Sequence, residues 1–287
     1  MTKTAIQIHS DTRLGYVHLT VADLERSLAF YQEALGFRLH RQEEDSAYLG
    51  AGQTDLLRLT GQPTARRASR TTGLYHFAIL VPTRFALAQS LRRIVETRTA
   101  VQGFADHGVS EAIYLADPDG NGIEIYRDRS RDQWPFQNGQ LSMVTDPLDV
   151  DGLLAELDGH GESWPGLSME TVLGHIHLHV ANVAEAEAFY RDVLGFELMQ
   201  RYGPSASFLS AGGYHHHIGV NTWTGAGAPP PPADAVGLRW FTVCLPDLAE
   251  LHKVTGRIES AGLVSEERRE GLFLRDPSQN GLILAVL

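Results

Sequence analysis

Apolar residues at helical spacing alternate with short β-rich runs along the chain. Leu24, Leu28 and Tyr31 recur three to four residues apart, which predicts the apolar face of a helix, and Gly36 supplies its C-terminal stop. Further on, a tight turn at 117–122 leads into an apolar strand. Because a first strand is followed by a helix and then by further strands, the pattern predicts a βαβββ module.

The second half of the sequence repeats the first at a constant offset of 159 residues. The matching segments are Leu14–Leu19 with Leu173–Leu178, Phe30-Tyr31 with Phe189-Tyr190, Leu35–Phe37 with Leu194–Phe196, Asp117-Pro118 with Asp276-Pro277, and Asn121-Gly122 with Asn280-Gly281. A fixed offset held over so long a stretch indicates a duplication. Each half divides again, because a glycine precedes a marked position by three residues in four segments. These segments are Gly15 to His18, Gly73 to His76, Gly174 to His177, and Gly237 to Trp240.

The repeats predict an α+β fold of four βαβββ modules. We place the first half at 1–128, with modules at 13–66 and 73–128, and the second half at 171–287, with modules at 171–224 and 236–287. Residues 129–170 are expected to form an irregular linker, because proline breaks them at three places.

Composition narrows the classes of function. The formal net charge is −11, so we expect neither a basic face nor a nucleic-acid partner. The single cysteine, Cys244, cannot form an internal disulfide, and no segment approaches membrane-span length. The N-terminus also lacks a charged region followed by an apolar stretch, so we expect a cytoplasmic protein without a membrane partner.

Candidate chemistry lies at the repeat positions. His18, His76 and His177 occupy the same place in their first strands, so we expect them to face equivalent concave sheets. Glu124 stands in an apolar strand, where a carboxylate is costly to bury unless it is paired or bound to a metal. Aligned by its preceding glycine, His215 takes the corresponding place in the third module.

A longer pattern resembles the signature of extradiol ring-cleavage dioxygenases, which belong to the vicinal-oxygen-chelate superfamily. It runs from His107 through Ile113-Tyr114, Asp117-Pro118 and Gly120 to Glu124, and it departs from the family at Ala105. The segments Gly73–Ala78 and Gly213–His217 resemble, more narrowly, the Bacillus-type catechol 2,3-dioxygenases. The resemblance covers essentially the whole chain and implies two barrel-like units, each built from a pair of modules.

The resemblance also implies an Fe(II) cofactor, with Mn(II) as the alternative, bound by two histidines and a glutamate. Such a site leaves positions open for a catecholic substrate and O2, and the implied reaction is extradiol (meta) cleavage to a hydroxymuconic semialdehyde-type product. Carried over residue by residue, His76 and Glu124 match metal ligands. His107 and Tyr114 match catalytic hydrogen-bonding residues, and His215 matches the catalytic acid/base.

The third ligand depends on which modules pair, because the signature lies in the second module rather than in the fourth. The fourth module has Trp240 and Ile283 at its ligand positions and cannot bind metal by itself. If modules one and two pair, the third ligand is His18. If modules two and three pair, it is His177, and the site gains His215. The long linker permits this crossed pairing, so we predict His177 as the ligand.

Neighbouring histidines leave alternatives open. His175 and His179 share the strand face of His177 and are candidates for lining the same pocket. Two residues beyond the predicted acid/base, His217 is the alternative for that role, and the intervening His216 is expected to point away.

Two other functions are compatible with the scaffold. One is a glyoxalase-like, metal-dependent lyase or isomerase, whose site usually carries two carboxylates. The other is a non-enzymatic resistance protein that binds an aromatic ligand between modules and needs no metal ligands. The histidine-rich ligand set favours the dioxygenase, since fold alone does not decide function. Homo-oligomerisation is possible, and the ring substituents of the substrate are left open.

Overall fold

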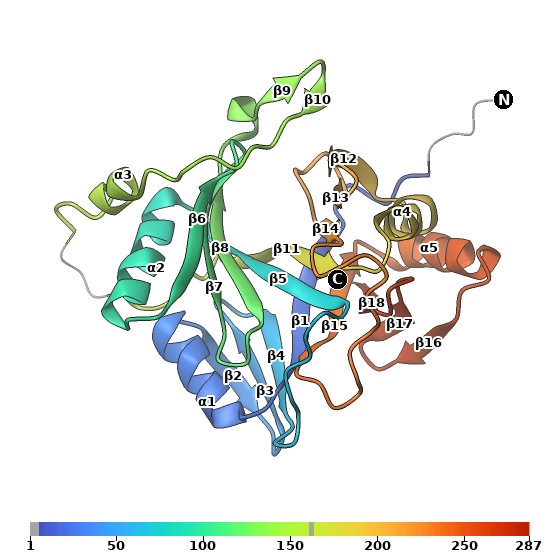
Figure 1. Cartoon of the computed structure of the whole chain (residues 1–287), viewed down its shortest axis with the longest axis horizontal. Coiled ribbons are helices and arrows are strands. Elements are labelled where there is room, and N and C mark those ends of the chain that lie inside the picture. Colours follow the sequence, from blue (N-terminus) through green and yellow to red (C-terminus); the bar gives the residue numbers. More distant parts are fainter. Residues whose placement is uncertain (1–5, 161–163, 287) are drawn as a thin grey trace.

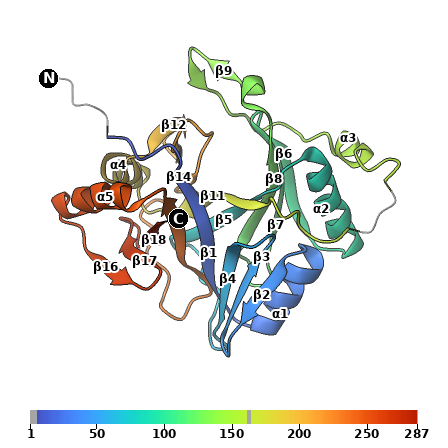
Figure 2. The same cartoon turned by 180° about the vertical axis from the view of Figure 1, so that it is seen from behind.

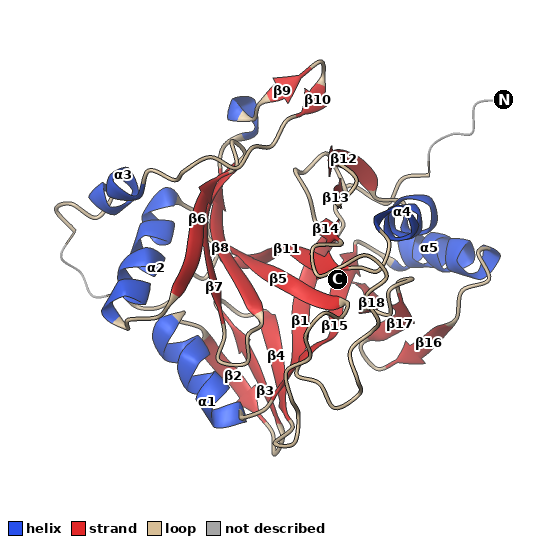
Figure 3. Cartoon of the chain, in the orientation of Figure 1, coloured by secondary structure: helices blue, strands red, loops and turns tan. Residues whose placement is uncertain are grey.

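Four βαβββ modules, as predicted, make up most of the molecule (Figures 1 and 3). The computed structural model describes residues 6–160 and 164–286. The first module comprises β1 (Arg13–Val21), α1 (Leu24–Ala29), β2 (Arg38–Gln42), β3 (Ser46–Gly50) and β4 (Asp55–Gly61). The second comprises β5 (Gly73–Leu80), α2 (Arg84–Glu96), β6 (Val101–Asp106), β7 (Ser110–Ala116) and β8 (Gly122–Asp128).

The second half repeats this order. The third module comprises β11 (Val172–His179), α4 (Val183–Ala188), β12 (Glu197–Tyr202), β13 (Ala206–Ser210) and β14 (Ile218–Asn221). The fourth comprises β15 (Gly237–Leu245), α5 (Leu248–Ser260), β16 (Ser265–Arg268), β17 (Gly271–Arg275) and β18 (Gly281–Val286). A π-helical turn extends α1 through Phe30–Ala34, and another extends α4 through Phe189–Leu194.

The module helices start at polar caps that the sequence supplies. The side chains of Asp23, Thr83, Asn182 and Asp247 each accept a hydrogen bond from a backbone N–H in the first turn of the helix that follows. Such caps satisfy N–H groups that have no partner inside the helix. Helices α1 and α2 lie on one side of the molecule and α4 and α5 on the other, with the sheets between them (Figures 1 and 2).

Two curled eight-stranded sheets form the core, and they confirm the crossed pairing. One sheet has the strand order β12-β13-β14-β11-β5-β8-β7-β6, and the other has the order β16-β17-β18-β15-β1-β4-β3-β2. Module two therefore pairs with module three, and module one with module four. In each sheet, the two first strands are antiparallel neighbours at the centre.

The segment between the halves contains short regular elements as well as irregular chain. A hairpin of β9 (Phe136–Gln137) and β10 (Gln140–Leu141) is followed by α3 (Val150–Ala155). Figure 1 shows the hairpin projecting beyond the sheets. None of the described helices is both long and apolar enough to cross a membrane.

Buried tyrosine–aspartate contacts connect modules that do not share a sheet. The Tyr31 hydroxyl of module one donates to Asp117 Oδ2 of module two at 2.9 Å. At the repeat-equivalent place, Tyr190 of module three donates to Asp276 of module four at 3.2 Å. All four side chains are buried, so each contact satisfies a carboxylate that has left water.

Candidate metal centre

Strand register places three site residues in one row across the sheet of modules two and three. His175 on β11 lies opposite Ala78 on β5, and Ala78 is the parallel neighbour of Glu124 on β8. Glu124 in turn lies opposite Tyr114 on β7. Because Ala78 has only a methyl group, the side chains of its two larger neighbours can meet above it. His76, two residues before Ala78, reaches the same point from the same strand face.

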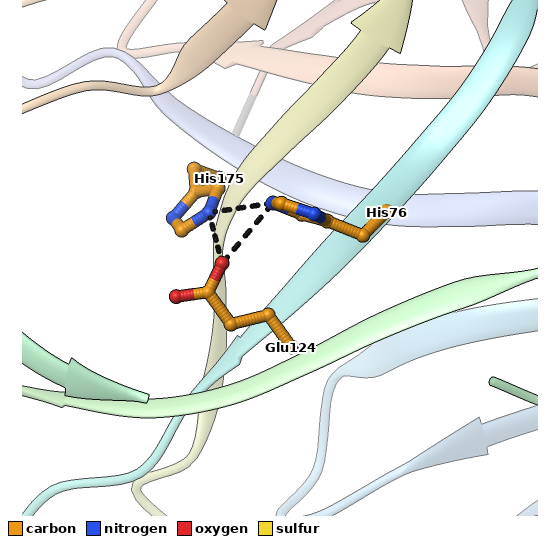
Figure 4. A group of neighbouring side chains, drawn as sticks. All are labelled: His76, Glu124 and His175. Atoms are coloured by element: carbon orange, nitrogen blue, oxygen red, sulfur yellow. Dashed lines mark hydrogen bonds and ion pairs between the residues drawn. The ribbon is translucent and has the colours of Figure 1, made fainter. Parts of the chain in front are cut away.

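The side chains of His76, Glu124 and His175 converge on one point (Figure 4). His76 Nε2 is 3.1 Å and His175 Nε2 is 3.0 Å from Glu124 Oε2, and the two nitrogens are 3.3 Å apart. The side chains are buried, at 6% exposure for His76 and 2% for each of the others. Ligand bonds of about 2.1 Å that meet at right angles would put neighbouring donor atoms about 3 Å apart. The donor set and its spacing therefore fit one face of an octahedral metal ion.

Electrostatics keep this centre in the state that binds a cation. Burial alone would raise the pKa of the Glu124 carboxyl, but the His175 and His76 imidazoles outweigh it and hold that pKa well below its usual range. Burial lowers the pKa of His175 to about 4, against the opposing pull of Glu124. A metal ligand must be an ionised carboxylate or a neutral imidazole, and Glu124 and His175 meet these conditions near neutral pH.

The third member of this group is His175, whereas the repeat position predicts His177 as the third ligand. His177 lies directly opposite His76 in the strand pairing. On β8 this row contains Gly122, two residues before Glu124. Its Nε2 is buried and has no hydrogen-bond partner among the described residues. The repeat position predicts His177 because it corresponds to His76 in the paired module. Only one of the two modules, however, supplies a glutamate. The group therefore sits in the row of Ala78, where β11 presents His175.

His18 lies outside the group, as the crossed pairing predicts. It belongs to the other sheet, where its Nε2 is 2.8 Å from Thr60 Oγ1. Its ring packs edge-on against Trp240, with ring centres 4.2 Å apart. That sheet therefore holds an aromatic contact at the place where its counterpart has His76 and His177.

The predicted catalytic residues His107 and Tyr114 lie beside the centre. His107 Nδ1 is 2.7 Å from the Val144 carbonyl oxygen, which can only accept, so this nitrogen carries the proton. His107 Nε2, 2.7 Å away from the Tyr114 hydroxyl, must then accept from it. Burial, and after it the nearby Glu124 carboxylate, raises the pKa of Tyr114 well above its ordinary value. Tyr114 is thus a neutral phenol with a fixed donor direction.

The three consecutive histidines occupy different places from those expected. His215, the predicted acid/base, is buried behind the cavity wall, and its Nε2 is 2.9 Å from Asp128 Oδ1. His216 instead lines the cavity, and its ring centre is 4.1 Å from that of His175. His217 Nδ1 accepts from the backbone N–H of Ala211 at 3.1 Å.

The reason is that these histidines precede the strand rather than belong to it. β14 begins only at Ile218, and the histidines before it lie in irregular chain after a turn at two glycines with positive φ, Gly212 and Gly213. Alternation of faces holds within strands and does not apply in irregular chain. Asn221, not His215, is therefore the counterpart of Glu124, since it stands two residues after Gly219, which pairs with His177 as Gly122 pairs with His76.

A cavity of about 500 Å³ opens onto the centre. Its walls include the candidate ligand group (His76, Glu124 and His175), His107, His216 and six aromatic side chains, which are Tyr75, Phe104, Tyr114, Tyr202, Phe208 and Trp223. Residues Met143 to Thr145 of the linker form another part of the wall. The Gln200 side chain fixes them, since it accepts from the Met143 N–H at 2.7 Å and donates to the Met143 carbonyl at 3.1 Å. The cavity can therefore hold a small aromatic molecule in contact with the ligand group.

Comparisons with known proteins identify the family of the chain. Residues 13–125 and 172–282 match the model of the Glyoxalase/Bleomycin resistance protein/Dioxygenase superfamily. The chain is 46% identical over 285 residues to a catechol-2,3-dioxygenase of Bacillus subtilis, covering 98% of this chain and 99% of that protein. It is 30% identical over 129 residues to a lactoylglutathione lyase of Neisseria meningitidis, covering 42% of this chain and 94% of that protein.

The fold has solved counterparts. Glyoxalase I from Zea mays superposes with a TM-score of 0.59 at 16% identity, covering 96% of this chain and 92% of that one. At this identity, the likeness concerns the fold alone. The family match and the 46% identity over nearly the full length decide the assignment. The chain belongs to the Glyoxalase/Bleomycin resistance protein/Dioxygenase superfamily and is a dioxygenase within it.

Proposed function

We propose that the protein catalyses Fe(II)-dependent extradiol cleavage of a catechol ring with O2, giving a hydroxymuconic semialdehyde-type product. The carrying observation is the group of two imidazole nitrogens and one carboxylate oxygen, which are buried together 3.0–3.3 Å apart. An iron(II) ion bound on one face by three such ligands keeps three positions free, so that it can bring a catecholate and dioxygen together. His76, Glu124 and His175 would be its ligands.

The surrounding residues can position and deprotonate a catechol. His216 is the histidine of the triple run that reaches the cavity, so it replaces His215 in the proposed acid/base role. It would take the proton from a catechol hydroxyl and later return a proton to the product. Tyr114, held by His107, borders the same space and would orient the substrate oxygen. The aromatic walls of the cavity would pack against the ring.

A lyase of the glyoxalase type is the other reading, because one half of the chain resembles lactoylglutathione lyases. Such a site usually needs a second carboxylate, and this structure has Asn221 at the counterpart of Glu124. The dioxygenase therefore accounts better for the ligand set.

The single cysteine is unpaired, which is compatible with the reducing cytoplasm that we propose as the location of the protein.

The test is anaerobic purification, loading with Fe(II) or Mn(II), and measurement of oxygen uptake with catechol. We expect about one O2 consumed per catechol, with a yellow ring-opened product and activity that depends on one of the two metals. In parallel, lactoylglutathione formation from methylglyoxal and glutathione is followed. Lyase turnover without oxygen uptake would overturn the proposal.

A further inference from the structure

A hydrogen-bonded chain of three side chains runs from Asp128, the last residue of β8, to the cavity. Asp128 Oδ1 is 2.9 Å from His215 Nε2, and His215 Nδ1 is 2.8 Å from His216 Nδ1. The Asp128 side chain is 24% exposed, His215 is fully enclosed, and His216 lines the cavity. These residues are linked directly, without an intervening side chain.

The donor direction along this chain follows from its first member. A carboxylate can only accept, so the proton on His215 must be on Nε2. In a neutral ring, His215 Nδ1 then has a lone pair and accepts, which requires that His216 donate from its own Nδ1. His216 Nε2 is therefore left with a lone pair. This nitrogen has no hydrogen-bond partner among the described residues and is not among their fully buried unpartnered atoms.

We propose that Asp128 and His215 are positioning residues that fix the tautomer and orientation of His216, so that its Nε2 faces the cavity as a proton acceptor. This inference rests on the proposed function, because it assigns the partners of its acid/base. Neither residue touches the cavity, so both act through His216. The arrangement follows the general rule that a third group must hold a catalytic histidine in the correct tautomer.

Strand β8 gives the proposal its geometric basis. Glu124 and Asp128 stand four residues apart on the same face of this strand, so one rigid element carries a proposed metal ligand and the orienting carboxylate. Tyr126, between them on that face, packs against His175 with ring centres 4.9 Å apart. The distance from His216 to the ligand group is thereby set by strand geometry.

Asp128 is itself held from a second side. Its Oδ2 accepts from the Tyr214 hydroxyl at 2.9 Å, and the Tyr126 hydroxyl is 2.7 Å from that of Tyr214. Since Tyr214 gives its proton to Asp128, Tyr126 must donate to Tyr214. The Trp134 ring from the linker packs on His215, with ring centres 5.5 Å apart. Both oxygens of Asp128 thus have assigned donors, and the His215 ring cannot turn freely.

The test compares Asp128→Asn with a matched control, Asp55→Asn. Asp55 Oδ1 also bonds a histidine, His40 Nδ1 at 2.7 Å, but this pair lies in the sheet of modules one and four. In Asp128→Asn, the amide can donate to His215 and reverse the chain, which puts a proton on His216 Nε2. Histidine ¹⁵N chemical shifts of the metal-free protein, assigned with a His216→Gln variant, report the tautomer directly.

We expect His216 Nε2 to change from unprotonated to protonated in Asp128→Asn and to stay unprotonated in Asp55→Asn. With catechol, Asp128→Asn should keep its bound metal and its KM within about twofold, while kcat falls at least about tenfold, as for the loss of a correctly oriented acid/base. Asp128→Glu should recover part of kcat. An unchanged His216 tautomer, or a loss of kcat that follows metal loss or unfolding, would overturn the proposal. The ¹⁵N result stands even if the wild-type protein shows no oxygen uptake with catechol, an outcome that would refute the proposed function instead.

Discussion

In the pairing of β5 with β11, His177 lies directly opposite His76. Its neighbour on the same face, His175, nevertheless completes the proposed ligand group. We therefore expect His175→Ala to lose bound metal and activity, because it removes one of three donors. His177→Ala should retain metal near the wild-type amount. Metal content of purified, Fe(II)-loaded protein gives the measurement.

His18→Ala is the matched control for this pair, since it removes the repeat-equivalent histidine from the other sheet. It should keep both metal and oxygen uptake. If His177→Ala lost the metal and His175→Ala kept it, the ligand set predicted from the repeat position would be right and the geometric one wrong.

A substitution at Ala78 tests whether Glu124 and His175 meet above this residue to bind the metal. Its methyl lies between Glu124 and His175, and the residue is fully buried. Ala78→Val adds two methyl groups where these side chains meet, so metal binding should fall at least tenfold. Overpacking costs typically about 1–3 kcal/mol, so the fold should survive.

The control for Ala78 is Ala112→Val, a buried alanine of the same sheet that pairs with Tyr126 and not with a ligand. Isothermal titration with Mn(II) under anaerobic conditions would compare the two variants. Equal metal affinities would mean that the space above Ala78 is not where the ligands meet.

Metal should stabilise the folded protein, because the complete site exists only in that state. An ion at a hundredfold excess over its Kd adds about 2.7 kcal/mol to the free energy of unfolding. Fe(II) or Mn(II) should raise the Tm of the wild type, and a chelator should reverse the effect. In Glu124→Gln, an amide replaces the ionised ligand, so the Tm should not respond. A metal-induced rise of Tm equal to that of the wild type would remove Glu124 from the ligand set.

The contribution of the two tyrosine–aspartate contacts between the sheets to stability can be measured with a pair of variants. Tyr31→Phe and Tyr190→Phe each remove a hydroxyl that donates to a buried aspartate. Hydrogen bonds to charged groups contribute about 1.5–3 kcal/mol, so each variant should lose a similar part of its free energy of unfolding. Urea denaturation measures this loss, and metal binding should be unchanged. A loss below about 0.5 kcal/mol in both variants would show that the two carboxylates find other partners.

Much of the architecture could be predicted from the repeats. The fixed offset indicated two duplicated halves, and the four glycine-marked segments divided them into four modules. The apolar residues at the ligand positions of the fourth module favoured the crossed pairing that the sheets show. Glu124 stood out because a carboxylate in an apolar strand needs a partner, and the partners are His76 and His175.

The identity of the third histidine could not be predicted in the same way. His175 and His177 point to one face of β11, and alternation cannot distinguish residues two apart. Only the register of β5 against both β11 and β8 shows which of them lies in the row of Glu124. His216 was missed for another reason, since the strand pattern was extended into irregular chain that precedes β14, which begins at Ile218.

The crossed pairing has a consequence for how such a chain can be assembled. Modules one and two share no sheet, so a half-chain ending near residue 128 would leave the central edges of β1 and β5 without their partners β15 and β11. Two such half-chains could supply each other's missing strands, as domain-swapped dimers do. The connectivity is that of an intertwined dimer whose subunits have been joined end to end, with residues 129–170 as the bridge. Neither half is then a folding unit by itself, and the protein should tolerate a cut in that bridge far better than the loss of either side of it.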